Sequence, residues 1–148
     1  MELDNTDKKI LNVMIKNSRL SMRQIAKKTN VSVATVMHHI RKLEADKVLL
    51  GNYSKIDYEK LGYDVEVVIE MRISKGKLME VEKKIATDPH VCAVYDVTGP
   101  FDAIILARFP SRRRMDNFLK RIQTFEFVER TETQLILKTI KEEQIEIE

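Results

Sequence analysis

One stretch in the first third of the chain carries side chains that could contact DNA. Small and hydroxyl-bearing residues come first, and histidines and basic residues follow within the next few helical turns. Small residues allow close approach to base edges, hydroxyl and imidazole groups can hydrogen-bond bases or phosphates, and basic groups neutralise backbone charge. The candidate DNA-binding residues are Ser32, Val33, Ala34, Thr35, His38, His39, Arg41 and Lys42. The alternative is a helical domain whose charged face only contacts solvent.

Other residues that could do chemistry are sparse or badly placed. Asp4 and Asp7 could be metal ligands, but carboxylates at the start of a helix usually act as caps. His38 and His39 are adjacent and would point about 100° apart on a helix, so this pair alone predicts no metal site. Cys92 is the single cysteine, lies in an apolar run and is expected to be a buried thiol. We therefore expect no catalytic residues, no metal and no cofactor.

Two short helices would precede the candidate DNA-binding residues. The first is predicted from about Asp4 to Asn17, where apolar residues recur at spacings of three and four. The second begins at Ser21, which stands at capping-box spacing from Gln24. It ends near Asn30, a residue type that tolerates the left-handed conformation of a tight turn.

The third predicted helix carries the candidate residues themselves. Ser32 would cap its N-terminus, and an apolar stripe would face inward at Val36, Ile40 and Leu43. A short helix, a tight turn and a longer helix predict a helix-turn-helix, whose second helix enters the major groove.

The segment after the third helix is predicted to form a wing. Residues 48–56 are compatible with two short strands around a turn at Gly51-Asn52. Lys47, Lys55 and Lys60 lie on or near this segment and could touch phosphates that flank the groove.

The second half of the chain predicts an α+β domain. Strands are expected at 64–74, 91–97, 103–109 and 131–140, and apolar stripes from Leu78 and from Met115 indicate two helices. The order βαββαβ is that of a ferredoxin-like unit, in which both helices cover one face of an antiparallel sheet. Apolar residues such as Val68 and Ile136 on the other face predict burial by a second subunit.

Length and charge favour two small domains, at 1–60 and 61–148. Residues 1–60 contain 12 Lys and Arg against 7 Asp and Glu, whereas residues 61–148 contain 14 against 16. The basic half is therefore the candidate for binding nucleic acid. The sequence has neither an apolar run that could span a membrane nor a signal-peptide pattern, so we expect a cytoplasmic protein without a membrane partner.

The whole chain resembles the Lrp/AsnC family of transcriptional regulators, also called feast/famine regulatory proteins. The resemblance implies a winged helix-turn-helix followed by an amino-acid-metabolism regulatory domain. It also implies sequence-specific binding to double-stranded DNA, modulated by a small amino-acid effector, and a homodimer that often assembles further into octamers. The matching residues are Leu3-Asp4, Asp7, Ile10-Leu11, Asn17-Ser18-Arg19, Ile25-Ala26, Ser32, Val36, Ile40, Leu43-Glu44, Gly51, Ile56-Asp57 and Leu61-Gly62.

Three positions depart from the family pattern. His39 stands where many members carry Arg, Asp46-Lys47 replaces the usual glycine before the wing, and Asn52 takes a position often held by Tyr. The apolar frame is intact, so these departures affect the expected operator sequence and not the expected fold.

The resemblance also implies an effector site between subunits, near the loop that joins the second and third strands of the regulatory domain. Gly99 would leave the backbone open to a carboxylate, and Asp102 could hold an ammonium group. The alternative is a plain hairpin turn, which Gly-Pro favours without any ligand. The matching residues are Thr98, Gly99, Pro100, Phe101 and Asp102, with Thr131, Thr133 and Gln134 of the last strand as the opposing wall.

Two charged segments have no role in this scheme. Ser111–Arg114 opens a predicted helix with three arginines, which oppose the local helix dipole and so favour a partner carboxylate. DNA wrapped around an oligomer is a second possibility for this run. The acidic tail Lys141–Glu148 alternates Glu with Ile, and this pattern assigns it no role.

Two further function classes compete with ligand-modulated transcription. Siroheme decarboxylase subunits resemble the same two-domain family, and His90, Tyr95 and the arginine run could contribute to a porphyrin-sized pocket. The sequence has no clustered acid-base or nucleophilic arrangement and no Gly-rich phosphate loop, so we expect a protein that is not an enzyme. An architectural DNA-packing protein without an effector would bind with weak sequence preference.

Overall fold

The computed structural model describes residues 2–148, which form two compact units. One unit contains the chain up to Lys55 together with Lys141–Glu148, and the other contains Ile56–Ile140. The observed division therefore places the C-terminal tail with the N-terminal helices. The domain boundary predicted from the sequence lies at residue 60 alone and leaves the tail in the second domain.

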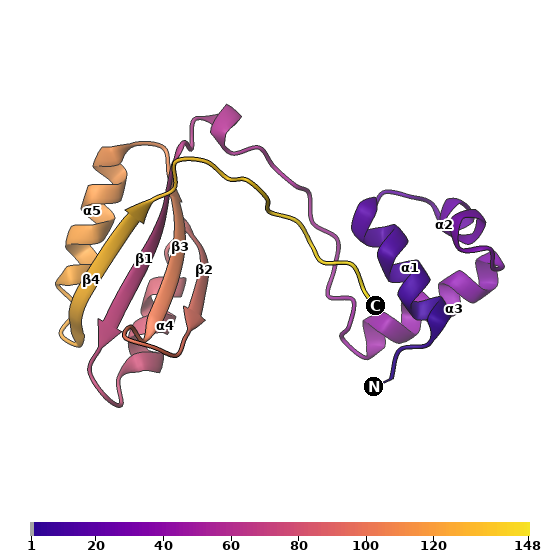
Figure 1. Ribbon diagram of the computed structural model, residues 1–148, viewed down its shortest axis with the longest axis horizontal. Helices are drawn as coiled ribbons and strands as arrows, with labels where there is room; N and C mark the ends of the chain where they lie inside the picture. Colours follow the sequence, from indigo (N-terminus) through magenta and orange to yellow (C-terminus); the bar gives the residue numbers. More distant parts are fainter. Residues whose placement is uncertain (1) are drawn as a thin grey trace. The chain divides into compact units, whose positions relative to one another are not determined.

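The N-terminal unit contains three helices, α1 (Asn5–Lys16), α2 (Met22–Thr29) and α3 (Val33–Ala45) (Figure 1). Their predicted caps are confirmed. Asp4 and Asp7 form a capping box at the start of α1, and Ser21 and Gln24 form another at the start of α2. Asn30 has φ 57° and ψ 45°, the left-handed conformation that turns the chain from α2 toward α3.

A small apolar core joins the three helices. Its buried members are Ile10 and Met14 of α1, Ile25 and Ala26 of α2, and Val36 and Ile40 of α3. Because these residues recur at helical spacing, each helix presents one apolar face to the core and leaves its polar face outward. This packing fixes which side of α3 reaches solvent.

The predicted wing strands are absent from the described structure. After α3 the backbone N–H groups of Val48 and Leu49 both donate to the Leu43 carbonyl, and residues 51–57 form neither helix nor strand. The prediction of two strands around Gly51-Asn52 is therefore wrong for this chain. A two-stranded hairpin without further strands or apolar cover is marginal in water, which accounts for the extended segment.

The C-terminal tail packs on α1 within the N-terminal unit (Figure 1). The side-chain amide of Asn12 donates to the Ile147 carbonyl at 2.9 Å and accepts from the Ile147 N–H at 2.8 Å. Lys16 pairs with Glu146 at 3.4 Å, and the Lys55 ammonium donates to the Glu142 carbonyl at 3.0 Å. The tail is thus held by hydrogen bonds to its backbone at both ends.

The C-terminal unit contains one antiparallel sheet of four strands in the order β2-β3-β1-β4. The strands are β1 (Val65–Ile73), β2 (Val91–Asp96), β3 (Ala103–Phe109) and β4 (Val128–Leu135). Helices α4 (Leu78–Ala86) and α5 (Arg112–Gln123) complete the predicted βαββαβ order, and the 3-10 helix η1 (Glu59–Leu61) precedes β1.

Both helices cover the same face of this sheet. Alternate residues of β1 and β3 are buried, and they pack in one cluster with Val81, Ile85, Phe118 and Ile122 of the two helices. The opposite face carries the half-buried Val68, Ile104 and Leu106 beside the ion pair of Glu66 and Arg108.

Two expectations for this unit are corrected. The last strand begins at Val128 and ends at Leu135, three residues earlier at its start than predicted and five earlier at its end. Cys92 is exposed, not buried, because it lies on the edge strand β2, where the register shifts between Val91 and Ala93.

Candidate nucleic-acid interface and effector loop

The N-terminal end of α3 presents small and polar side chains to solvent. Val33, Ala34 and His38 are exposed, as is Arg41 one turn further on. The Ser32 hydroxyl accepts the Thr35 N–H at 3.0 Å and lies 2.8 Å from the Thr35 hydroxyl. A second helix of a helix-turn-helix that offers such groups near its N-terminus has the geometry for contacting base edges.

The cap at Ser32 gives a first prediction. Replacing Ser32 by Ala should lower the free energy of unfolding of the N-terminal unit by about 1 kcal/mol, since one helix N–H loses its acceptor. Urea unfolding followed by circular dichroism measures the change. Ser18→Ala, which removes an exposed hydroxyl for which the structure shows no hydrogen bond, is the matched control. Equal stability of the two variants would contradict the capping role.

His39 and Lys42 differ from the other six candidates, because their polar ends contact Asp7 of α1. His39 Nδ1 lies 2.7 Å from Asp7 Oδ1, and Lys42 Nζ lies 3.1 Å from Asp7 Oδ2. Asp7 is fully buried, and an ionised carboxylate can only accept, so both partners donate to it. These two residues therefore join α3 to α1, a contact between residues far apart in sequence that local patterns do not reveal.

The electrostatics of Asp7 favour its charged form. Burial opposes ionisation, but the hydrogen bonds from His39, the Asp4 N–H and Lys42, together with the charge of Lys42, outweigh it and lower the pKa of the Asp7 carboxyl. Ligand atoms of Asp4, Asp7 and His39 lie within 4.8 Å of one another. The Lys42 ammonium already supplies the positive charge that this cluster needs, so the arrangement is that of an ion-pair network.

In the C-terminal unit, the loop 98–102 joins β2 to β3 and is anchored by its last residue. Asp102 Oδ2 accepts the Ile73 N–H at 2.8 Å, and the Asp102 N–H donates to the Met71 carbonyl at 2.9 Å. One oxygen of Asp102 thus binds the end of β1. Thr98, Gly99 and Pro100 are exposed, and Gly99 has φ 117°, a conformation that L side chains rarely adopt.

The three candidate residues on β4 do not share one face. Thr131 pairs with the buried Met71 and accepts a hydrogen bond from Gln123 of α5, so it lies on the helix-covered side. Thr133 lies on that side as well, whereas Gln134 points to the opposite face and donates to Glu70 at 3.1 Å. Within one chain, Gln134 and the two threonines cannot line the same wall.

Arg130 is a residue that the sequence analysis did not select. Its guanidinium carbon lies 5.9 Å from the centre of the Phe101 ring, and the guanidinium also pairs with Glu132. The contact brings a cation from β4 to the loop 98–102. It was missed because the last strand had been predicted to begin at Thr131, one residue later.

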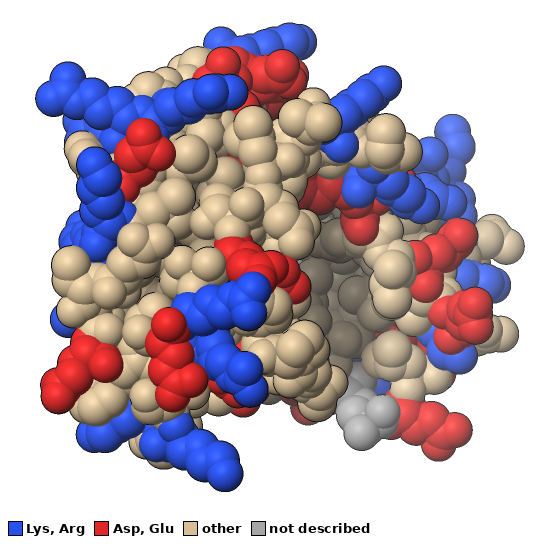
Figure 2. Space-filling model, turned by 60° about the vertical axis from the view of Figure 1, so that its left-hand side comes forward, with Lys and Arg blue, Asp and Glu red and all other residues tan. Residues whose placement is uncertain are grey.

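The surface that Figure 2 shows carries charges of both signs. Lys and Arg side chains alternate there with Asp and Glu and with uncharged surface, and neither sign forms a continuous area. Such a surface offers no broad basic area for DNA. Across the described residues 2–148, no helix has the length and apolar character needed to cross a membrane.

A helix-turn-helix unit joined to a βαββαβ unit defines a two-domain transcriptional regulator. Residues 3–49 match the family model for winged helix-turn-helix DNA-binding, and residues 66–145 match that for the Lrp/AsnC ligand binding domain. The chain belongs to the Lrp/AsnC family, as the resemblance implied.

Relatives and solved structures agree with this assignment. The chain is 46% identical over 143 residues to an uncharacterised HTH-type transcriptional regulator of Pyrococcus furiosus, covering 97% of each chain. It is 34% identical to the HTH-type transcriptional regulator FL11 of Pyrococcus horikoshii, covering 95% of this chain and 93% of the relative.

Two solved structures share the fold. Escherichia coli AsnC superposes with a TM-score of 0.91 at 24% identity, covering 99% of this chain and 100% of that one. A transcriptional regulator of Neisseria meningitidis, solved as a complex with L-Met, superposes with a TM-score of 0.88 at 22% identity, covering 96% and 94%.

Proposed function

We propose that this protein is a cytoplasmic, sequence-specific DNA-binding regulator whose α3 enters the major groove of double-stranded DNA. The observation that carries the proposal is the exposed N-terminal end of α3, where Val33, Ala34 and His38 face solvent while Val36 and Ile40 are buried. Ser32, Thr35 and Arg41 complete the proposed contact surface, and His39 and Lys42 orient α3 through Asp7.

The proposed functional unit is a homodimer or a larger symmetric assembly such as an octamer. One helix of the length of α3 contacts only a few base pairs, and two-fold symmetric operators match two-fold symmetric proteins. The helix-free face of the sheet, with Val68, Ile104 and Leu106 at its centre, is the surface that a second subunit would cover.

The proposed effector is a small amino acid bound at the loop 98–102. The open backbone at Gly99, the second carboxylate oxygen of Asp102 and the guanidinium of Arg130 offer partners for a ligand that carries both charges. The L-Met complex of the Neisseria regulator supports a ligand of this class. An effector changes DNA affinity only if it binds one state of the protein better than the other.

Fluorescence anisotropy on the DNA upstream of the protein's own gene, against scrambled DNA, tests this function. We expect selective binding that one or a few amino acids shift. Equal binding to both DNAs without any amino-acid response would instead indicate an architectural DNA-packing protein. No binding even at low salt, with a tetrapyrrole bound by the purified protein, would indicate a relative of the siroheme decarboxylases.

Gly99→Ala tests the effector loop separately from DNA binding. The added Cβ would meet no atom within 4 Å, so the cost is the strained backbone, about 1 to 3 kcal/mol for a residue held in a sparsely populated conformation. We expect weaker amino-acid binding in calorimetry and unchanged DNA affinity without effector. Gly62→Ala, at φ 82° in the same unit and also without a nearby atom, is the control. Equal effector affinity of Gly99→Ala and the parent chain would argue against the loop.

A further inference from the structure

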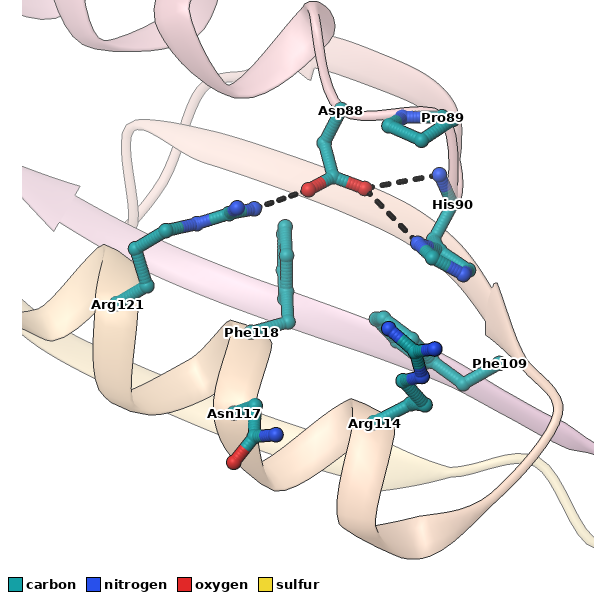
Figure 3. Close-up of a pocket in the computed structure, with 8 residues that line it drawn as sticks. All are labelled: Asp88, Pro89, His90, Phe109, Arg114, Asn117, Phe118 and Arg121. Atoms are coloured by element: carbon teal, nitrogen blue, oxygen red, sulfur yellow. Dashed lines mark hydrogen bonds and ion pairs between the residues drawn. The ribbon is translucent and has the colours of Figure 1, made fainter.

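The C-terminal unit has a hollow that lies away from the loop 98–102. It is a groove of about 350 Å³ between α5 and the segment that joins α4 to β2 (Figure 3). We call it the Arg114 groove; Asp88, Pro89 and His90 line one side, and Arg114, Asn117 and Arg121 of α5 line the other. Phe109, at its base, is the last residue of β3, whereas the loop 98–102 precedes the first, so the two places are separated by about 20 Å of strand.

The base of the Arg114 groove is aromatic. Phe109 is fully buried and Phe118 is nearly so, and their ring centres lie 5.3 Å apart. The imidazole of His90 stacks on Phe109 at 5.2 Å with an interplanar angle of 20°. Because both phenylalanines are buried, the ring that stays accessible in the groove is that of His90, which suits a flat or apolar body of small size.

Asp88 fixes the polar side of the groove. Its Oδ1 accepts the His90 N–H at 2.8 Å and lies 3.2 Å from His90 Nδ1, while its other oxygen accepts from Arg121 (Figure 3). Burial opposes ionisation of Asp88, but these hydrogen bonds and the charge of Arg121 outweigh it and lower the pKa of the carboxyl. Asp88 therefore stays charged, neutralises Arg121 and holds His90 against Phe109.

Arg114 is the cation of this groove that Asp88 does not neutralise. Among residues 2–148 no carboxylate pairs with Arg112, Arg113 or Arg114, although all three lie in the first turn of α5. The helix dipole is positive at this end, so the three charges add to an unfavourable potential that an anion would relieve. Figure 3 shows the Arg114 side chain on α5, on the side of the groove opposite the segment that carries His90. An adjoining hollow, lined by Ser111 and Arg113, shares Arg114 and Asn117 with it.

We propose that the Arg114 groove binds a small organic carboxylate. The guanidinium of Arg114 takes the carboxylate through paired N–H donors, and the flat or apolar body lies against the ring of His90, which stacks on the buried Phe109. The His90 ring favours a molecule with a flat body over a DNA phosphate, which has none. The proposal is independent of the amino-acid effector at the loop 98–102.

Ligand-observed fluorine NMR on the full-length protein tests the proposal, with 4-fluorobenzoate as the probe and 4-fluorobenzamide as its uncharged counterpart. We expect the benzoate alone to broaden, and benzoate without fluorine to displace it. Arg114→Ala should weaken binding at least about tenfold, the loss expected when one charge-assisted pair is removed. Arg112→Ala, which removes the same charge from the same turn but from outside the groove lining, should leave the affinity within about twofold.

Several results would overturn the proposal. Equal binding of the amide, or no binding of the benzoate at millimolar concentration, would show that the groove does not select a carboxylate. Equal losses for Arg112→Ala and Arg114→Ala would assign the effect to diffuse charge. A change of sedimentation coefficient in Arg114→Ala without ligand would assign the guanidinium to another subunit's carboxylate, and displacement of the probe by unrelated duplex DNA would assign it to DNA.

Discussion

Replacing Asp7 by Asn should lower the free energy of unfolding of the N-terminal unit by about 2 to 3 kcal/mol, because a buried charged acceptor loses its bonds. The carboxylate receives His39, Lys42 and the Asp4 N–H, and an amide can accept on one side only. Its NH2 group would face a donor. Thermal and urea unfolding by circular dichroism measure the loss.

Glu44→Gln is the matched control for Asp7→Asn. Glu44 is an exposed residue of α3 whose side chain forms no hydrogen bond or ion pair with the described residues 2–148, so the same change from acid to amide should shift stability little. If the two variants unfolded alike, the Asp7 contacts would contribute nothing to the fold.

The same variant predicts a pH dependence. The pKa of Asp7 is lower in the folded chain than its ordinary value of about 3.9, so the unfolded chain binds more protons in the acid range. The stabilisation is complete above that ordinary value and is lost as the pH falls through the folded pKa. The stability difference between the parent chain and Asp7→Asn should therefore shrink below about pH 4. A difference that stayed constant down to pH 2 would mean that the Asp7 charge is not its source.

Replacing Ala34 by Glu should reduce DNA affinity by about a hundredfold or more, since a carboxylate would meet base edges and phosphates in the groove. The fold should tolerate the change, because Ala34 is the exposed second residue of α3, where a negative charge favours the helix dipole. Anisotropy on the operator gives the affinity, and thermal unfolding verifies the fold.

Met79→Glu provides the comparison for Ala34→Glu. Met79 is 67% exposed and, like Ala34, is the second residue of its helix, α4. The Met79→Glu variant therefore adds the same charge at an equivalent helix position in the other unit. DNA affinity near that of the parent is expected for Met79→Glu. If Ala34→Glu also bound DNA with an affinity near that of the parent chain, the N-terminal end of α3 would not contact DNA.

Features of the fold that depend on neighbouring residues could be predicted from the sequence. The caps at Asp4, Ser21 and Ser32 and the left-handed Asn30 are local chemistry, and all are confirmed. The βαββαβ order followed from apolar periodicity and is confirmed as well. Features that depend on distant partners could not be predicted.

Three examples show where local patterns are insufficient. The wing segment has suitable residue types, but no further strand completes it. Cys92 lies in an apolar run, but that run forms the sheet edge. For the candidate sites, the exposed end of α3 was predictable from helical spacing, whereas the Asp7 contact of His39 and the opposite direction of Gln134 required the packing of other elements.

The position of the C-terminal tail makes the C-terminal unit an insertion within the N-terminal unit. The chain leaves the N-terminal unit after Lys55 and re-enters it at Lys141, and the Lys55 side chain bonds the Glu142 backbone beside these two crossing points. A fragment that ends at residue 60 would lack the tail, leaving the amide of Asn12 without its bonds to Ile147.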